Sequence, residues 1–299
     1  MKHKTCSLDC IYCECGETTD LTVKRRSFFP VEDVLNEIDH TLSQRPYLDY
    51  ITFSGSGEPT LSKDIGRVID YLNSHYPEYK TALLTNSTLL TDESLRDEIL
   101  PLDLIIPSIN AVTEDIFQKM NKPHRDVGTS TIIKGLLEFR KSYKGMFWIE
   151  LFIVPNINDN NDEIEKIKEI CLQLSPDKIQ LNTLDRPAPH NNSIKAASWE
   201  SLSKIKEILA PLPVEITTSV IPGNEKDGRE DNQALVLKKI KQILSRRPST
   251  VDDLSESLGL RIVEINKYLR LLENEKILLF KDGARGRFYY VESNVIEEL

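Results

Sequence analysis

Three cysteines near the start of the chain could bind a metal ion or an iron–sulfur cluster. Three residues separate Cys6 from Cys10, two separate Cys10 from Cys13, and Cys15 follows directly behind. The whole chain holds only five cysteines, and this spacing is too tight for periodic core positions. Nothing in the sequence marks secretion, so disulfides are not expected, because thiols stay reduced in the cytosol. A metal or cluster site is the better explanation.

Two kinds of site suit these thiols. All four thiolates together would complete a closed tetrahedral zinc site. Alternatively, Cys6, Cys10 and Cys13 would hold a [4Fe-4S] cluster and leave one iron without a protein ligand. An iron with an open position can bind a further molecule and take part in chemistry. The spacing also differs from the Cys-x2-Cys-x2-Cys-x3-Cys run of bacterial ferredoxins.

Short apolar segments that alternate with amphipathic ones predict a parallel α/β sheet built from βα units. Strands are expected at residues 49–53, 81–84, 102–106, 146–154, 177–181 and 214–217. Helices are expected at 31–44, 63–75, 91–100, 113–120, 128–143, 160–174 and 198–209. These elements give a first domain that spans residues 1–217.

Polar residues follow the expected strands at the points where they end. In parallel α/β architectures the carboxyl ends of the strands form the ligand-binding edge. We therefore expect the polar side chains at these ends to surround one opening. They are Ser56, Glu58, Thr85, Asn86, Ser108, Asn110, Asn182 and Thr183.

The last third of the chain changes character. Residues 218–233 are polar, charged and interrupted by Pro and Gly, which indicates a linker. A helix is then expected at 234–245, another that opens at Thr250, and a third at 261–274. Strands at 277–280 and 287–291 would form a hairpin through Asp282-Gly283 and Gly286. This order of elements is typical of a winged helix, so residues 234–299 are predicted to form a small second domain.

The composition describes an ordinary globular protein. Hydrophobic residues make up 39% of the chain and charged residues 28%, and no apolar run reaches the length of a membrane span. No signal peptide precedes the cysteines, so the expected location is the cytoplasm. The net charge of −9 disfavours non-specific wrapping of nucleic acid, although a local basic patch is compatible with it.

The cysteine loop and the turn after the first strand together resemble the signatures of the radical S-adenosylmethionine (SAM) superfamily. That signature is Cys-x3-Cys-x-aromatic-Cys, with Tyr12 as the aromatic residue, followed later by Gly57-Glu58-Pro59. The resemblance covers residues 1–217. Four segments are similar to uncharacterised Fe–S oxidoreductases grouped with the wyosine-forming radical SAM proteins: 54–61, 84–87, 121–124 and 177–183.

The resemblance implies a partial (β/α)6 barrel. Only five residues precede Cys6, where the family usually has a strand, so either the barrel lacks its first strand or the chain starts late. The resemblance also implies that Cys6, Cys10 and Cys13 hold the cluster while SAM chelates the fourth iron. An electron donor such as flavodoxin or ferredoxin would then drive cleavage of SAM to a radical that abstracts hydrogen from a substrate.

The resemblance also suggests which residues contact SAM and substrate. The expected SAM contacts are Tyr12, the turn Ser56-Gly57-Glu58-Pro59, the strand-end residues Thr85, Asn86, Ser108 and Asn110, and Asn156. The carboxylate of Glu58 is expected to accept from the SAM ammonium. The expected substrate contacts are His124, Arg125, Asn182, Asp185 and Arg186. Cys171 lies on an amphipathic helix and is interpreted as a core residue, so it offers no second cluster.

These expectations converge on an oxidoreductase-like radical SAM enzyme with an unidentified substrate, for which RNA is favoured. One alternative is a radical SAM enzyme or activase that modifies a peptide or protein, with the winged helix as its recognition module. A second alternative is a non-enzymatic Fe–S or zinc sensor that binds DNA. The repeated βα units and the Gly-Glu-Pro turn favour the enzyme, because a sensor would need neither.

Overall fold

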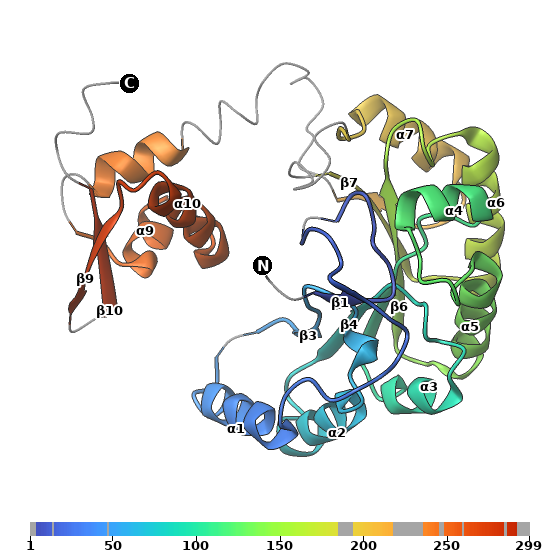
Figure 1. Ribbon diagram of the computed structural model, residues 1–299, viewed down its shortest axis with the longest axis horizontal. Helices are drawn as coiled ribbons and strands as arrows, with labels where there is room; N and C mark the ends of the chain where they lie inside the picture. Colours follow the sequence, from blue (N-terminus) through green and yellow to red (C-terminus); the bar gives the residue numbers. More distant parts are fainter. Residues whose placement is uncertain are drawn as a thin grey trace. The chain divides into compact units, whose positions relative to one another are not determined.

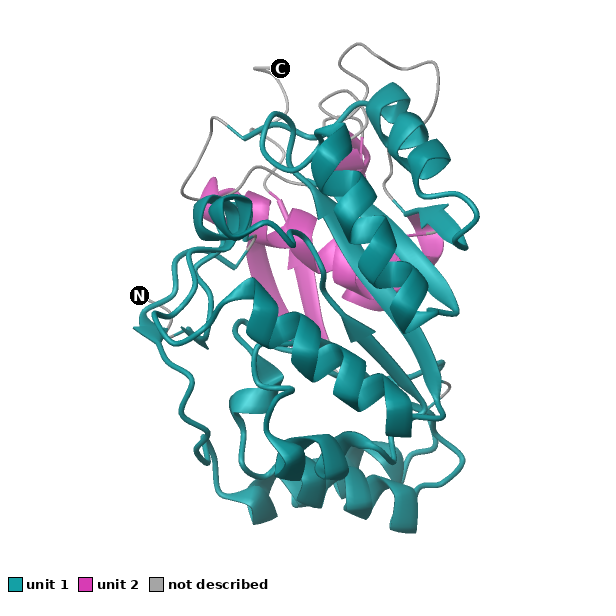
Figure 2. Cartoon of the chain, turned by 90° about the vertical axis from the view of Figure 1, so that its right-hand side faces the viewer, with its two compact units in different colours: residues 1–220 teal, residues 221–299 magenta. Residues whose placement is uncertain are grey.

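The computed structural model of the chain divides into two compact units, residues 1–220 and 221–299, which Figure 2 distinguishes by colour. The structure describes residues 4–13, 15–46, 48–184, 194–217, 236–244, 248–258, 260–283 and 286–291. The helices within these ranges are all too short or too polar to cross a membrane.

Unit 1 is built on a six-stranded sheet in which every neighbouring pair of strands is parallel and the strand order follows the sequence. All six expected strands are confirmed. They are β3 (Ile51–Phe53), β4 (Thr81–Thr85), β5 (Leu104–Pro107), β6 (Met146–Ile153), β7 (Lys178–Thr183) and β8 (Val214–Ile216). Sequential parallel order with a helix between strands is the arrangement of an open (β/α) barrel.

Helices cover the outer side of this sheet (Figure 1), and each forms close to where the sequence predicts it. They are α1 (Val31–Leu42), α2 (Ile65–His75), α3 (Glu93–Ile99), α4 (Glu114–Asn121), α5 (Thr129–Ser142), α6 (Asn161–Leu174) and α7 (Trp199–Ile208). Side chains that prefer helix N-termini fix several starts. Asn160, for example, accepts a hydrogen bond from the backbone N–H of Glu163 at 3.0 Å.

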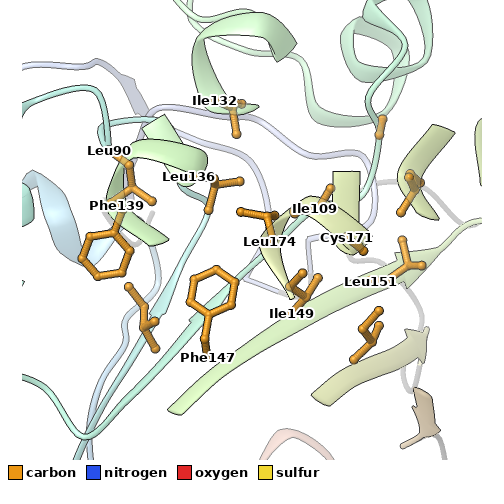
Figure 3. Packing of buried hydrophobic residues seen from close by; sticks show 14 of the residues in the cluster. Leu90, Ile109, Ile132, Leu136, Phe139, Phe147, Ile149, Leu151, Cys171 and Leu174 are labelled. Carbon is orange, nitrogen blue, oxygen red and sulfur yellow. The ribbon is translucent and has the colours of Figure 1, made fainter. Parts of the chain in front are cut away.

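Strand β6 shows how the sheet separates its two faces. Its burial alternates strictly along the strand, since successive side chains of a strand point to opposite faces. Phe147 and Ile149 are buried among Phe139 of α5 and Leu174 of α6 (Figure 3). Glu150 belongs to the alternate set, so its carboxylate lies on the face that the helices leave uncovered.

The cysteine loop forms a small sheet of its own. Strand β1 (Thr5–Cys6) pairs in parallel with β2 (Asp20–Leu21), outside the six-stranded sheet. The sequence did not predict this two-residue pairing, because two residues carry no periodicity. Within the described residues, the six strands of the large sheet all follow the cysteine loop.

Unit 2 has its own hydrophobic core, formed by Ile240, Leu244, Leu254, Ile265, Leu269, Leu272 and Val291. Residues 236–244 are helical and are followed by α9 (Val251–Leu258), α10 (Ile262–Asn274) and the hairpin of β9 (Leu279–Gly283) and β10 (Gly286–Tyr290). The hairpin was predicted to turn through Asp282-Gly283 and Gly286. The position of this turn was wrong, because Asp282 pairs with Arg287 and Gly283 with Gly286 within the ladder. The expected linker at 218–233 lies outside the described residues.

Candidate functional site

The cysteine loop packs against the end of α4. The backbone N–H groups of Asp9 and Ile11 donate to the carbonyls of Asn121 and Met120, each at 3.0 Å. Within the described residues, no three His, Cys, Asp or Glu side chains converge so as to hold a single metal ion. A [4Fe-4S] cluster does not need such convergence, because each cysteine binds a different iron.

Each of the three cysteine sulfurs receives a hydrogen bond from a side-chain nitrogen. The Lys4 ammonium donates to Cys13 Sγ at 3.1 Å. Asn121 Nδ2 donates to Cys10 Sγ at 3.3 Å, and Asn86 Nδ2 lies 3.6 Å from Cys6 Sγ. Donors aimed at sulfur suit thiolates that carry negative charge, as cluster ligands do. The donor set therefore fits an iron–sulfur cluster.

In the absence of iron, burial keeps the thiols of Cys6 and Cys10 protonated. It raises the pKa of Cys6 to about 12 and that of Cys10 to about 11. Burial lowers the pKa of Lys4, but its hydrogen bond to Cys13 and its electrostatic interactions with the three cysteines outweigh this effect, so the pKa is raised overall. Lys4 is therefore a cation, while the two buried thiols ionise at neutral pH only when a metal replaces their protons.

Tyr12 connects the cysteine loop to the sheet. Its ring stacks on Phe152 of β6 with the ring centroids 4.4 Å apart. Its hydroxyl accepts from Nδ2 of Asn110 at 2.6 Å and from Nδ2 of Asn121 at 3.0 Å. Asn110 in turn accepts from the backbone N–H of Phe152 at 2.8 Å. The side chain of Tyr12 is thus held in one position; its expected contact with adenine stays a prediction.

Glu58 is buried, and its carboxylate is occupied by the chain itself. Oε1 accepts from Thr60 Oγ1 at 2.6 Å, from the Thr60 N–H at 3.0 Å and from Thr85 Oγ1 at 2.7 Å. Oε2 accepts from the N–H of Asn86 at 2.8 Å. The carboxylate therefore ties the Gly-Glu-Pro turn to the end of β4; the expected contact of Glu58 with the SAM ammonium stays a prediction.

Gly57 allows the turn to approach the cysteine loop closely. A Cβ atom at this position would lie 1.7 Å from the carbonyl oxygen of Thr5. The next residue, Glu58, donates its N–H to that same carbonyl at 3.2 Å. Only glycine fits here, because any side chain would displace β1 and with it Cys6.

A cavity of about 270 Å³ opens between the cysteine loop and the strand ends. It brings together residues that the sequence scatters over the first half of the chain. Lining residues that were predicted are Cys6, Cys10, Tyr12, Cys13, Ser56, Gly57, Glu58, Pro59, Thr85, Asn86, Ser108 and Asn110. Asn156 is not among the lining residues; it is exposed, with a φ of 63°, and its N–H donates to Asp159 at 2.8 Å.

Glu150 lines the same cavity and was missed by the sequence analysis. Its Oε2 accepts from Ser108 Oγ at 2.8 Å and its Oε1 from Asn182 Nδ2 at 3.1 Å. Asn182 thus reaches the cavity wall through Glu150. The signal for Glu150 was present, since it is the only charged residue in the strand 146–153. Lys4 and Asn121 were missed as site residues as well; no local pattern marks Lys4, whereas Asn121 opens the segment 121–124 that carries the resemblance.

Two other expected substrate contacts, His124 and Arg125, are not among the lining residues of the cavity. His124 donates its backbone N–H to the carbonyl of Ser7 at 2.9 Å, and its ring lies 3.6 Å from Asp126. The side chain of Arg125 is 89% exposed. Asp185 and Arg186 lie outside the described residues. Cys171 is fully buried in the main core, as expected, and burial raises its pKa to about 12.

Comparison with known proteins identifies the class. The radical SAM superfamily matches residues 3–170, and the chain belongs to this superfamily. The cofactors of such proteins are a [4Fe-4S] cluster and SAM.

Two relatives and one solved structure are similar to the chain. It is 31% identical over 286 residues to the UPF0026 protein MJ1312 of Methanocaldococcus jannaschii, covering 94% of this chain and 87% of that one. It is also 31% identical over 277 residues to the GTPase Obg of Brachyspira hyodysenteriae, covering 92% of this chain but only 40% of that relative's length. A radical SAM methyltransferase from Sphaerobacter thermophilus shares the fold, with a TM-score of 0.54, 17% identity, and coverage of 72% of this chain and 63% of that one.

Proposed function

We propose that the chain is a radical SAM enzyme in which Cys6, Cys10 and Cys13 hold the [4Fe-4S] cluster and the adjoining cavity takes SAM. The observation that carries this proposal is the convergence of these thiols with polar residues from separate strand ends on one cavity. Reductive cleavage of SAM at such a cluster supplies a 5′-deoxyadenosyl radical that abstracts hydrogen. An electron donor such as flavodoxin or ferredoxin would provide the electron.

The residues of the chain would orient the cofactor and shield the reaction. Tyr12 and Asn110 are fixed to each other and to β6, which gives SAM one rigid wall. We assign the contacts with the SAM ammonium to the turn Ser56–Pro59, through its backbone and through the carboxylate of Glu58. Leu8 and Ile109 are buried apolar residues of the cavity wall, and they would keep water away from a reactive intermediate.

Anaerobic reconstitution tests this function. The purified chain is supplied with iron, sulfide, SAM and a reductant, and iron content and 5′-deoxyadenosine are measured. We expect both in the parent and in a Cys171→Ala control, and neither in Cys10→Ala. Stoichiometric zinc in place of iron under anaerobic conditions would reject the enzyme and favour the zinc sensor.

For the substrate we propose RNA, recognised by unit 2 as a winged-helix module. Support comes from the hairpin, where Phe280 is 52% exposed and the Arg287 guanidinium lies 4.1 Å over its ring. Arg287 is also held by Asp282 at 3.1 Å. An exposed aromatic ring with a stacked arginine is a platform on which unpaired bases can stack. The resemblance to the wyosine-forming group points to the same class of substrate.

Binding of single-stranded RNA to the whole chain tests this assignment. We expect affinity to fall steeply with salt, because phosphate contacts release counterions. Phe280→Ala should weaken binding by about 1–3 kcal/mol, the range for loss of one base-stacking contact. Phe29→Ala, which removes an even more exposed ring from unit 1, is the matched control. Tight, sequence-specific binding of duplex DNA at physiological salt would favour the sensor instead.

A further inference from the structure

Lys4 is a buried cation among the three cysteines. Lys4 as a whole residue is only 4% exposed. The ammonium donates to Cys13 Sγ at 3.1 Å and to the carbonyl oxygen of Gly16 at 2.7 Å. The second contact fixes the ammonium in place, so its position does not depend on the sulfur alone.

The charge of Lys4 acts on all three thiols at once. Its ammonium contacts Cys13 Sγ, and Lys4 lines the same cavity as Cys6 and Cys10. Asn121 and Asn86 supply hydrogen bonds to Cys10 and Cys6 but carry no charge. In a poorly hydrated site a charge acts with much less screening than in water. Lys4 is therefore the strongest of the three donors.

A buried cation favours the reduced form of a nearby cluster. Reduction adds one electron, hence one negative charge, and the cation stabilises the reduced form more than the oxidised form. Hydrogen bonds to the cysteine sulfurs act in the same direction, and such contacts are among the factors that set cluster potentials. The Glu58 carboxylate, which lines the same cavity as Cys6, acts in the opposite direction.

We propose that Lys4 is a positioning residue that raises the reduction potential of the cluster and so makes the electron transfer that precedes SAM cleavage more favourable. Asn121 and Asn86 contribute smaller effects of the same sign. The inference rests on the proposed cluster ligands, but it concerns the cluster alone and needs neither SAM nor substrate.

The midpoint potential of the reconstituted whole chain tests the role of Lys4. It is measured by redox titration, with the electron paramagnetic resonance signal of the reduced cluster as readout, in the absence of SAM. For Lys4→Met we expect at least a tenfold lower equilibrium constant for reduction, which equals a decrease of about 59 mV for one electron. Lys4→Arg keeps the charge and should stay close to the parent.

Lys24→Met is the matched control. Lys24 is exposed, so its charge is screened by solvent, and its loss should leave the potential unchanged. The proposal is overturned if Lys4→Met keeps the parental potential, or if Lys24→Met shifts it as far as Lys4→Met does.

A second variant covers the case in which Lys4→Met does not assemble a cluster. Lys4→Gln keeps an N–H donor without the charge and should also show the lower potential. If both neutral variants lose iron while Lys4→Arg retains it, Lys4 serves assembly and the proposed effect on the potential is wrong. If the parent protein holds the cluster but does not cleave SAM, the proposed function is contradicted, and the potential can still be measured to test the role of Lys4. A parent without a cluster contradicts both.

Discussion

Single side chains in the cysteine loop have contacts that reach far along the chain. Asn121 is 111 residues from Cys10, and Asn110 is 98 residues from Tyr12, yet each pair is hydrogen-bonded. These contacts hold a short irregular loop that has little core of its own. The loop therefore depends on unit 1 being folded before its thiols are placed for iron.

The ligand assignment predicts that the five cysteines fall into two groups. Alanine at Cys6, Cys10 or Cys13 should abolish cluster binding, because the loss of one thiolate removes the ligand of one iron. Alanine at Cys15 or Cys171 should leave the iron content unchanged, although Cys171→Ala leaves a small gap in the core. Iron is measured after anaerobic reconstitution. Loss of iron in Cys15→Ala together with retention in Cys6→Ala would overturn the assignment.

We expect a change at Glu58 to affect SAM affinity more than cluster binding. Glu58→Ala removes the acceptor of four hydrogen bonds that shape the turn. We expect SAM affinity of the reconstituted protein to fall about tenfold, which corresponds to 1.4 kcal/mol, with iron retained. Thr52→Ala, an exposed position on the preceding strand, is the control. Equal SAM affinity in Glu58→Ala and the parent would mean that the turn does not contact SAM.

Two glycines of the same turn provide a matched pair. Gly57→Ala would force its Cβ against the Thr5 carbonyl, so β1 must move and the iron content should drop sharply. Gly55→Ala meets its nearest atom at 3.9 Å, an ordinary contact, and should bind iron like the parent. Iron per chain after reconstitution is the measurement, and similar iron contents in both variants would refute the close approach.

At the scale of elements, Asp39 joins α1 to α2. Its carboxylate accepts from the Tyr71 hydroxyl at 2.6 Å and from the Tyr76 hydroxyl at 2.7 Å. These hydrogen bonds favour the ionised form and lower the pKa of Asp39 below its usual 3.8. Together with the apolar contacts around Leu35, they fix α1 on the outer side of the sheet.

The lowered pKa of Asp39 gives a pH dependence with a defined sign. The unfolded chain binds this proton at a higher pH than the folded one, so the contribution of Asp39 to stability is complete above pH 3.8. It is lost as pH falls from that value through the lower pKa of the folded state. Asp39→Asn should therefore reduce the loss of thermal stability between pH 6 and pH 3. A parent and a variant that lose stability equally over this range would contradict the coupling.

At the scale of the molecule, two separate cores imply two units that can be tested apart. The main core of unit 1 and the core of unit 2 share no residue. A chain that ends near Gly228 should therefore keep the fold of unit 1 and its cleavage of SAM, while turnover of an RNA substrate is lost. The yields of 5′-deoxyadenosine and of modified RNA are compared with those of the whole chain. Full RNA turnover by the shortened chain would remove unit 2 from substrate recognition.

The sequence by itself was enough to predict the strands and helices of unit 1, and to propose which cysteines hold the cluster. Strand β6 illustrates why: its run of apolar residues, interrupted only by Glu150, is a local property that predicts a buried strand. The Cys-x3-Cys-x2-Cys spacing is local too. The winged-helix interpretation of unit 2 stays a prediction, although its helices and hairpin form near the expected positions.

Only the tertiary structure decided what the polar residues do. The Glu58 carboxylate is held by Thr60, Thr85 and Asn86, and the sequence alone did not indicate these partners. Asn156, an expected SAM contact, is exposed and is not among the lining residues of the cavity, while Lys4 carried no signal and contacts Cys13 directly. A hydrogen bond depends on a few tenths of an ångström and on direction. Periodicity specifies which face a residue lies on, and only the packed fold determines which distant partner meets it there.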